Sequence, residues 1–285
     1  MKCGFQNEVF SSKSPTSFSR GPLGVMYQKI MVISTPIQSE IVLENIVNGN
    51  YWDKPIMENF QDFEVCFVGL HPFYQIKQGH ENKIKFENGN WPKKREIIDH
   101  CDKLTWSEFM IISGINDYKH LDHALSFREW ARPKGDKKYF DILSQTLNIK
   151  HKEIIAPTTD AIPDILIDHI LNFFKSFGHS NFYLKYDYND EEVLKNLDSE
   201  IMNESNFGGH QIIKTIDSKL QIVTDFDCHQ SYFMGEKNKI DDLVNKIDLE
   251  GFYCDSLTTR NWSFDVIPEE RVVDWNYTLE KIHNA

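Results

Sequence analysis

The chain has 285 residues, of which 40% are hydrophobic and 26% are charged, a balance typical of globular proteins. Its formal net charge of −12 repels a phosphate backbone, so we expect no nucleic-acid partner. The five cysteines include no CxxC pair, which favours free thiols in a reducing compartment over a disulfide or zinc framework. No apolar run approaches the roughly 20 residues of a membrane helix, so we expect no membrane partner and predict a cytoplasmic protein.

The first half of the chain contains one strong strand pattern. Residues 1–25 are polar and rich in serine, and we predict a flexible polar tail there. The apolar run from Phe63 to Leu70 is nearly continuous, which predicts a strand buried on both faces. The dipeptide His71-Pro72 then ends this strand, because proline cannot donate to a strand ladder.

A helical block follows this strand. Apolar residues at helical spacing continue as far as Cys101 and Leu104, which predicts a helix through these positions. The residues Thr105 to Glu108 have the form of a capping box, so we expect a short helix to begin there and to end at Gly114. The sequence predicts two further helices, over residues 117–130 and 139–147.

The second half alternates strands and helices. The most apolar stripe runs from Ile162 to Phe177 and predicts a mostly covered helix that ends at Gly178. Asp217 and Ser218 have the composition of a two-residue hairpin turn between strands. The remaining elements that we predict are strands over residues 182–186, 211–216, 220–226, 231–234 and 251–254 and helices over residues 190–202 and 240–247.

These patterns predict an α+β fold, with a helical N-terminal part packed with a mainly antiparallel C-terminal sheet that carries helices on one face. No linker rich in proline, glycine or serine interrupts the chain, so residues 26–285 are predicted to form a single compact body. If that body is subdivided, the expected parts are residues 26–155, mainly helical, and 156–285, which contain the sheet.

One cluster of residues could carry chemistry. Asp225, Asp227 and His229 alternate at the end of a predicted strand, and they share a face if the strand continues through them. Two carboxylates and an imidazole could bind a divalent metal ion or form an acid-base set, so these three residues are candidate catalytic residues and metal ligands. The alternative is that Asp227 to Gln230 simply form the loop to the next strand.

Two further histidines are candidate binding residues. If Asp217 and Ser218 form the hairpin turn, the register places His210 opposite Asp225, although a slip of one residue would move His210 to the other face. His71 lies at the end of the buried strand, and functional residues are common at strand ends. The alternative for His71 is a hydrogen-bonded residue that holds the turn at Pro72.

Three short segments carry a resemblance to a known family: Leu70 to Phe73, Thr224 to Phe233 and Glu250 to Cys254. They resemble an uncharacterised family of cytosolic proteins from Bacillus-type bacteria, over most of the chain after about Tyr51. The resemblance implies no activity, because that family has no established function.

The sequence therefore leaves two hypotheses about function. The first is a non-catalytic or regulatory module whose acidic surface binds a protein or small-molecule partner. The second is a metal-dependent, hydrolase-like enzyme that uses Asp225, Asp227 and His229, with His210 and His71 as contributors. Convergence of these side chains is what the second hypothesis requires.

Overall fold

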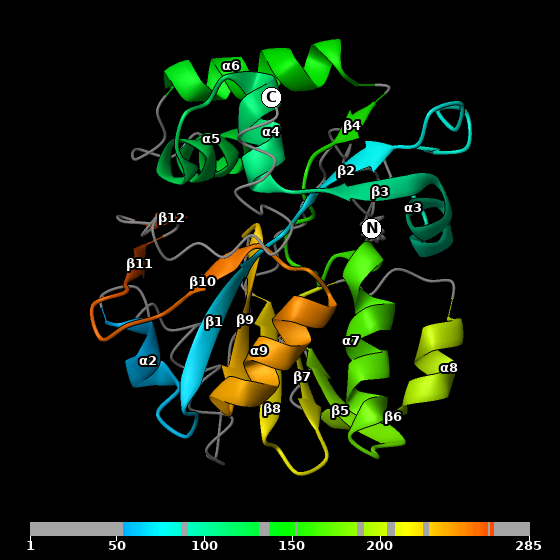
Figure 1. The fold of residues 1–285 in the computed structure, drawn as a ribbon, viewed down its shortest axis with the longest axis vertical. Coiled ribbons are helices and arrows are strands. Elements are labelled where there is room, and N and C mark those ends of the chain that lie inside the picture. The colour runs from blue at the N-terminus through cyan, green and yellow to red at the C-terminus, as the bar shows by residue number, and fades with distance from the viewer. Residues whose placement is uncertain are drawn as a thin grey trace, which may run out of the picture.

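The computed structural model describes residues 54–86, 91–130, 137–151, 153–186, 191–203, 209–224, 228–261 and 263–264. Two main sheets organise this part of the chain, and Figure 1 shows the larger sheet below the smaller one. The predicted polar tail, residues 1–25, lies outside the described residues. None of the described helices is long and apolar enough to cross a membrane.

The larger sheet has seven strands, and every neighbouring pair in it is antiparallel. In spatial order its strands are β10 (Gly251–Tyr253), β1 (Val65–Leu70), β9 (Gln230–Gly235), β8 (Leu220–Thr224), β7 (Gln211–Thr215), β5 (Asn181–Tyr186) and β6 (Glu192–Asn196). The early strand β1 therefore lies inside a sheet whose other strands come from the second half of the chain.

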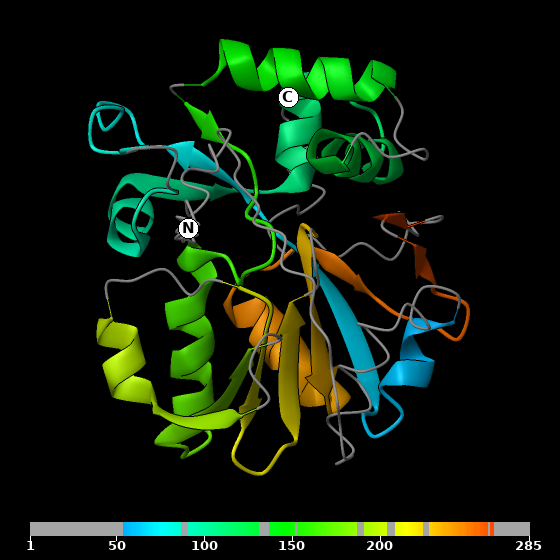
Figure 2. The same ribbon diagram turned by 180° about the vertical axis from the view of Figure 1, so that it is seen from behind.

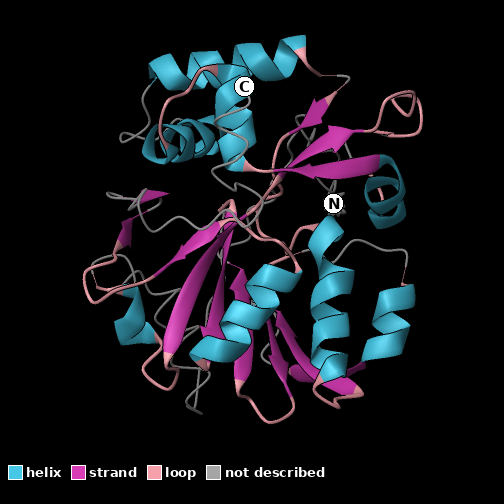
Figure 3. Cartoon of the chain, viewed as in Figure 1, coloured by secondary structure: helices cyan, strands magenta, loops and turns pink. Residues whose placement is uncertain are grey.

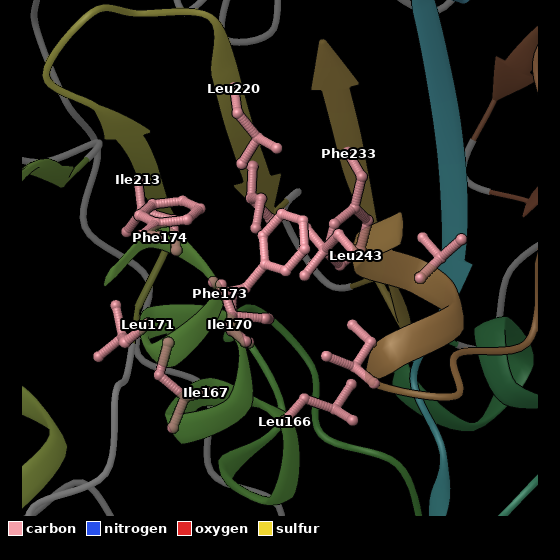
Figure 4. Close-up of a cluster of buried hydrophobic side chains, with 14 of the residues drawn as sticks. Leu166, Ile167, Ile170, Leu171, Phe173, Phe174, Ile213, Leu220, Phe233 and Leu243 are labelled. Carbon is pink, nitrogen blue, oxygen red and sulfur yellow. The ribbon is translucent and has the colours of Figure 1, made fainter. Parts of the chain in front are cut away.

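Helices pack on both faces of this sheet. The helices α7 (Asp164–Ser176) and α9 (Lys237–Lys246) cover one face, and in Figure 2 the sheet lies in front of α9. Figure 4 shows Phe174 of α7 beside Ile213 of β7, in the same core as Phe173 and Phe233. The short helix α2 (Ile56–Asn59) contributes to a second apolar core, which contains Val68, Val223 and Tyr232 on the opposite face.

The smaller sheet has β2 (Phe73–Ile76) at its centre, between β3 (Cys101–Leu104) and β4 (Ile154–Ile155), all antiparallel. One apolar cluster joins it to the helices α4 (Trp106–Ser113), α5 (Tyr118–Trp130) and α6 (Lys137–Ile149). Another joins it to α3 (Lys94–His100). Only His71 and Pro72 separate β1 from β2, so one nearly continuous stretch of chain links the two sheets.

The prediction of a helical N-terminal part is wrong, because helices and strands are interspersed along the chain. Figure 3 shows helices and strands in both the upper and the lower part of the molecule. Two predicted helices contain strands instead. Residues Cys101 to Leu104 form β3, because their backbone pairs with β2. The predicted helix over residues 190–202 is instead β6, which pairs with β5, followed by the short helix α8 (Leu197–Met202). Long-range pairing overrides the local helical pattern at both places.

Other local predictions are confirmed. The Thr105 side chain accepts a hydrogen bond from the Glu108 amide at the start of α4, and Gly114 ends this helix with a φ of 74°. The observed pair Ile212 and Val223 shows that the β7–β8 hairpin has the predicted register. A small ribbon of β11 (Arg260–Asn261) and β12 (Ser263–Phe264) completes the described elements. The division into one or two bodies stays a prediction.

Candidate functional site

Buried polar side chains gather at one end of the seven-stranded sheet. The strands β1 and β8 finish at this end, and their antiparallel partners β7, β9 and β10 begin there. The buried polar residues of this polar end are His71, Thr158, His210, Gln211, Thr224, His229, Gln230, Ser231 and Glu250. Polar groups in an interior need hydrogen bonds, so each of these side chains has either a structural or a chemical role.

His71 joins three parts of the fold at the polar end. Its Nδ1 lies 2.9 Å from the Thr158 carbonyl oxygen, and its Nε2 lies 2.7 Å from the Ser231 hydroxyl. A carbonyl oxygen only accepts, so Nδ1 carries the proton and Nε2 of the neutral ring accepts from Ser231. The Trp106 indole also donates to the His71 carbonyl at 2.8 Å. His71 thus links β1, β9, α4 and the loop that precedes α7.

The pair of Ser231 and His71 has the order of groups found in nucleophilic catalysis, a hydroxyl beside an imidazole that a third group orients. Each of these two residues is only 1% exposed. A nucleophile must reach its substrate, and the described arrangement seals both groups in the interior. The contacts therefore support the structural alternative for His71, in which it holds the turn at Pro72.

His210 lies beside an acidic residue that sequence patterns did not single out. Its Nε2 is 3.4 Å from Oδ1 of Asp160, in the loop between β4 and α7. Asp160 has a φ of 63°, a left-handed conformation that aspartate tolerates better than most residues. The only sequence signal for Asp160 is its place in a polar turn. The register on which the predicted pairing of His210 with Asp225 depends is observed at Ile212 and Val223, but Asp225 itself lies outside the described residues.

The three residues of the predicted cluster are only partly described. Asp225 and Asp227 lie outside the described residues, so their convergence with His229 stays a prediction. The strand β8 ends at Thr224 and β9 begins at Gln230. His229 therefore belongs to the connection between two antiparallel strands and not to a continuation of β8, because the chain reverses direction between them. Within the described residues, no group of three or more His, Cys, Asp or Glu side chains could hold a metal ion.

Glu250 is a second buried link, between the larger sheet and the helix α4, and the sequence analysis missed it. Its carboxylate accepts hydrogen bonds from the backbone amides of Trp106 and Ser107, at 2.5 and 3.1 Å. The hydroxyls of Ser107 and Tyr118 also donate to it. Because the first amides of a helix lack partners within the helix, a carboxylate at this position stabilises α4. No local pattern could have found a contact that spans 144 residues.

The edge strand β6 is the most exposed strand of the larger sheet. Four of its five residues are exposed, including the apolar side chains of Val193 at 37% and Leu194 at 55%. In the described part of the chain, β6 pairs only with β5. Such an edge presents backbone donors and acceptors to a partner.

Comparison with known proteins places the chain in one family. A model of the family described as "Protein of unknown function (DUF2711)" matches residues 52–264, which are most of the chain. That span includes the three segments that carry the resemblance seen in the sequence. No curated protein and no solved structure matches the chain.

Proposed function

The chain belongs to the DUF2711 family of unknown function, and we propose that it is a non-catalytic, regulatory module that binds a protein or small-molecule partner. Of these two kinds of partner, the arrangement of β6 favours a protein. The observation that carries the proposal is the exposure of this edge strand, together with its two adjacent exposed apolar residues, Val193 and Leu194.

An exposed edge strand binds an extended segment of another protein by adding it to the sheet. Backbone hydrogen bonds give such a contact its affinity, and side chains that alternate between the two faces give it specificity. Val193 and Leu194 are consecutive in β6, so they lie on opposite faces of the sheet. A segment added beside β6 would therefore bury apolar surface on both faces.

Charge indicates the composition of the partner segment. The chain carries a net charge of −12, and Glu191 and Glu192 are exposed at the start of β6, although Glu192 also pairs with Lys214. Complementary charge increases the rate of encounter between proteins and excludes wrong partners. We therefore expect the partner to offer an extended segment in which apolar residues alternate with Lys or Arg.

A substitution on β6 tests this proposal. Tagged full-length protein would capture partners from extracts of the cells that produce it, and the identified partner would then be purified and titrated by calorimetry. Leu194→Lys places a charge on the edge strand, a device that blocks edge-to-edge pairing. We expect binding to weaken by about tenfold or more, equivalent to about 1.4 kcal/mol.

The matched control is Ile216→Lys, the same kind of substitution at an exposed apolar residue next to the β7–β8 turn. This variant should bind the partner as tightly as the unmodified chain. Equal affinity of both variants and the parent would contradict a role for β6. Binding of only a small molecule, unaffected by Leu194→Lys, would also contradict it.

One observation favours a second candidate function, the metal-dependent, hydrolase-like enzyme. The observed pairing of Ile212 with Val223 has the register that was predicted for this hairpin, and His210 lies beside Asp160. A divalent ion held by Asp225, Asp227 and His229 would have these two side chains as neighbours. His71 is a weaker candidate for this metal site than His210, because both of its ring nitrogens already have hydrogen-bond partners.

Metal analysis tests this candidate. Purified protein should contain a divalent metal ion, and EDTA should lower its melting temperature, because a ligand that binds only the folded state stabilises it. Asp225→Ala should abolish the metal content. Asp217→Ala, at the opposite end of the same hairpin, should retain it. Absence of metal together with an unchanged melting temperature in EDTA would eliminate the metal site.

A further inference from the structure

Two of the five cysteines lie opposite each other on neighbouring strands. The β1–β10 ladder pairs Phe67 with Tyr253 and Val68 with Phe252, and one further step brings Cys66 opposite Cys254. The Cys254 amide donates a hydrogen bond to the Cys66 carbonyl at 2.9 Å. The pairing therefore continues one residue beyond the end of β10.

The backbone at this pair is compatible with a disulfide. Opposite residues joined by a hydrogen bond in an antiparallel ladder have Cα atoms about 5.5 Å apart, within the span of about 4.4 to 6.8 Å that disulfides bridge. Both side chains lie on the same face of the sheet, in or against the core that contains Val68 and Phe252. Each thiol projects from its strand beside the other, because directly opposite residues of a ladder carry neighbouring side chains. In a hydrogen-bonded pair the Cβ atoms lie up to about 5.5 Å apart, whereas a disulfide holds them about 3.5–4.5 Å apart. Formation of the bond therefore requires the two strands to approach each other by about 1 Å.

The two thiols differ in access to solvent. Cys66 is buried, whereas Cys254 is partly exposed. The other two described cysteines, Cys101 and Cys228, are both buried. They lie apart from this pair in the fold, at the start of β3 and just before β9. A dissolved oxidant therefore meets Cys254 first, with one thiol already beside it.

We propose that Cys66 and Cys254 form a reversible disulfide when the protein meets a peroxide. In the first step the Cys254 thiolate attacks a peroxide oxygen, the O–O bond breaks, and the departing hydroxide takes a proton to become water. In the second step the Cys66 thiol loses its proton, its thiolate attacks the Cys254 sulfur, and the S–O bond breaks. The departing hydroxide takes up a proton and leaves as a second water. Two thiols are oxidised and one hydrogen peroxide is reduced to two waters.

The burial of Cys66 determines the pH dependence of bridge formation. Burial, with a smaller contribution from the neighbouring Cys254, raises the pKa of the Cys66 thiol well above its usual value. Only the thiolate attacks sulfur, and a raised pKa keeps its fraction low near neutral pH. We therefore expect the rate of bridge formation to increase as the pH rises above neutral.

The test follows the thiols of full-length reduced protein during exposure to hydrogen peroxide. After free thiols are blocked by alkylation, peptide mapping by mass spectrometry should find the peptides of Cys66 and Cys254 linked, with a loss of two hydrogen atoms. Cys101 and Cys228 should be recovered as alkylated thiols once the protein is unfolded. A dithiol reductant should restore both linked cysteines.

Two variants make the result specific. In Cys254→Ser the linked peptides should be absent and Cys66 should remain a thiol, whereas Cys228→Ser, the matched control, should form the link as the parent does. Cys254 is partly exposed, so its replacement by serine removes little buried surface. Recovery of both thiols after peroxide, or a link from either one to a different cysteine instead, would overturn the proposal.

Discussion

The two edge strands of the larger sheet differ in exposure: β10 is mostly buried, whereas β6 is mostly exposed. Gly251 and Phe252 of β10 are buried, and Glu250 just before them reaches across to the start of α4. Most of β6 is exposed, and the chain continues from it directly into α8. Natural sheets cover an edge or limit it with short strands and charges. The buried edge β10 therefore contributes mainly to stability, whereas the exposed edge β6 is the surface to which the proposed function assigns the partner.

The largest expected effect is at Glu250, which joins the β10 edge to α4. Glu250→Ala leaves the buried amide of Trp106 and the neighbouring Ser107 amide without their acceptor. We expect it to lower the free energy of unfolding by about 3–4 kcal/mol, because each buried donor left without its acceptor costs about 1–3 kcal/mol. Denaturant unfolding followed by circular dichroism measures this loss.

The control for that prediction is Glu192→Ala on β6. Glu192 forms an ion pair with Lys214 at 2.6 Å, near the surface. Surface ion pairs contribute about 0–1 kcal/mol, so the loss should be several times smaller. Similar losses for the two variants would contradict the contrast between the edges.

A smaller loss is expected when a methyl group is added to β10. At Gly251 a new Cβ would lie 2.0 Å from the Val68 carbonyl oxygen and 2.6 Å from Cε1 of Phe67. Gly251→Ala must therefore push the two strands apart, and we expect a loss of about 2–3 kcal/mol in unfolding free energy. Thermal and denaturant unfolding should both detect it.

On β6, Val193→Ala trims an exposed side chain and should cost less than about 1 kcal/mol. An unfolding free energy for Gly251→Ala equal to that of the parent would mean that β10 moves freely. The idea of a tightly packed edge at β10 would then fail.

The smallest expected effect depends on pH. Asp241 of α9 accepts hydrogen bonds from Lys237 and from the Tyr253 hydroxyl of β10, at 2.7 and 2.5 Å. Partial burial alone would raise the pKa of Asp241, but these hydrogen bonds and the Lys237 charge outweigh it and lower that pKa. The resulting stability is present above the pKa of an unfolded aspartate, about 3.9, and is lost as the pH falls through the lower folded pKa.

Asp241→Asn should therefore remove part of the stability measured near neutral pH and flatten its decline below pH 4. Asp241 is more than one third exposed, so solvent screening limits the effect to less than about 1 kcal/mol. Unfolding free energies across the acid range measure it. An acid decline as steep in Asp241→Asn as in the parent would show that this contact with β10 does not contribute.

Several elements could be predicted from the sequence because local interactions determine them. The Thr105 and Glu108 capping box, the glycine end of α4 and the β7–β8 turn depend on residues a few positions apart. The helix α7 was predicted because its apolar stripe is wide enough to be buried on most sides. The sequence pattern of α7 did not reveal that its Asp168 pairs with the buried Lys94 of α3, at 2.5 Å.

The polar end of the sheet could be predicted only in part. His71, His210 and His229 were found because they stand at the ends of apolar runs, where strands give way to turns. Their partners Thr158, Asp160 and Ser231 were not found, because the contacts of His71 with Thr158 and Ser231 span 87 and 160 residues. Periodicity carries no information about contacts at such separations.

By itself the sequence determined the buried character of β1 and most helices and strands of the second half, although it missed β6. Only the tertiary structure decided where β1 pairs, that Cys101 to Leu104 form a strand, and that Glu250 reaches α4. A strand obtains its hydrogen bonds from other segments, whereas a helix obtains most of its own internally. Helix ends are therefore specified locally, while strand partners depend on the folding of the whole chain.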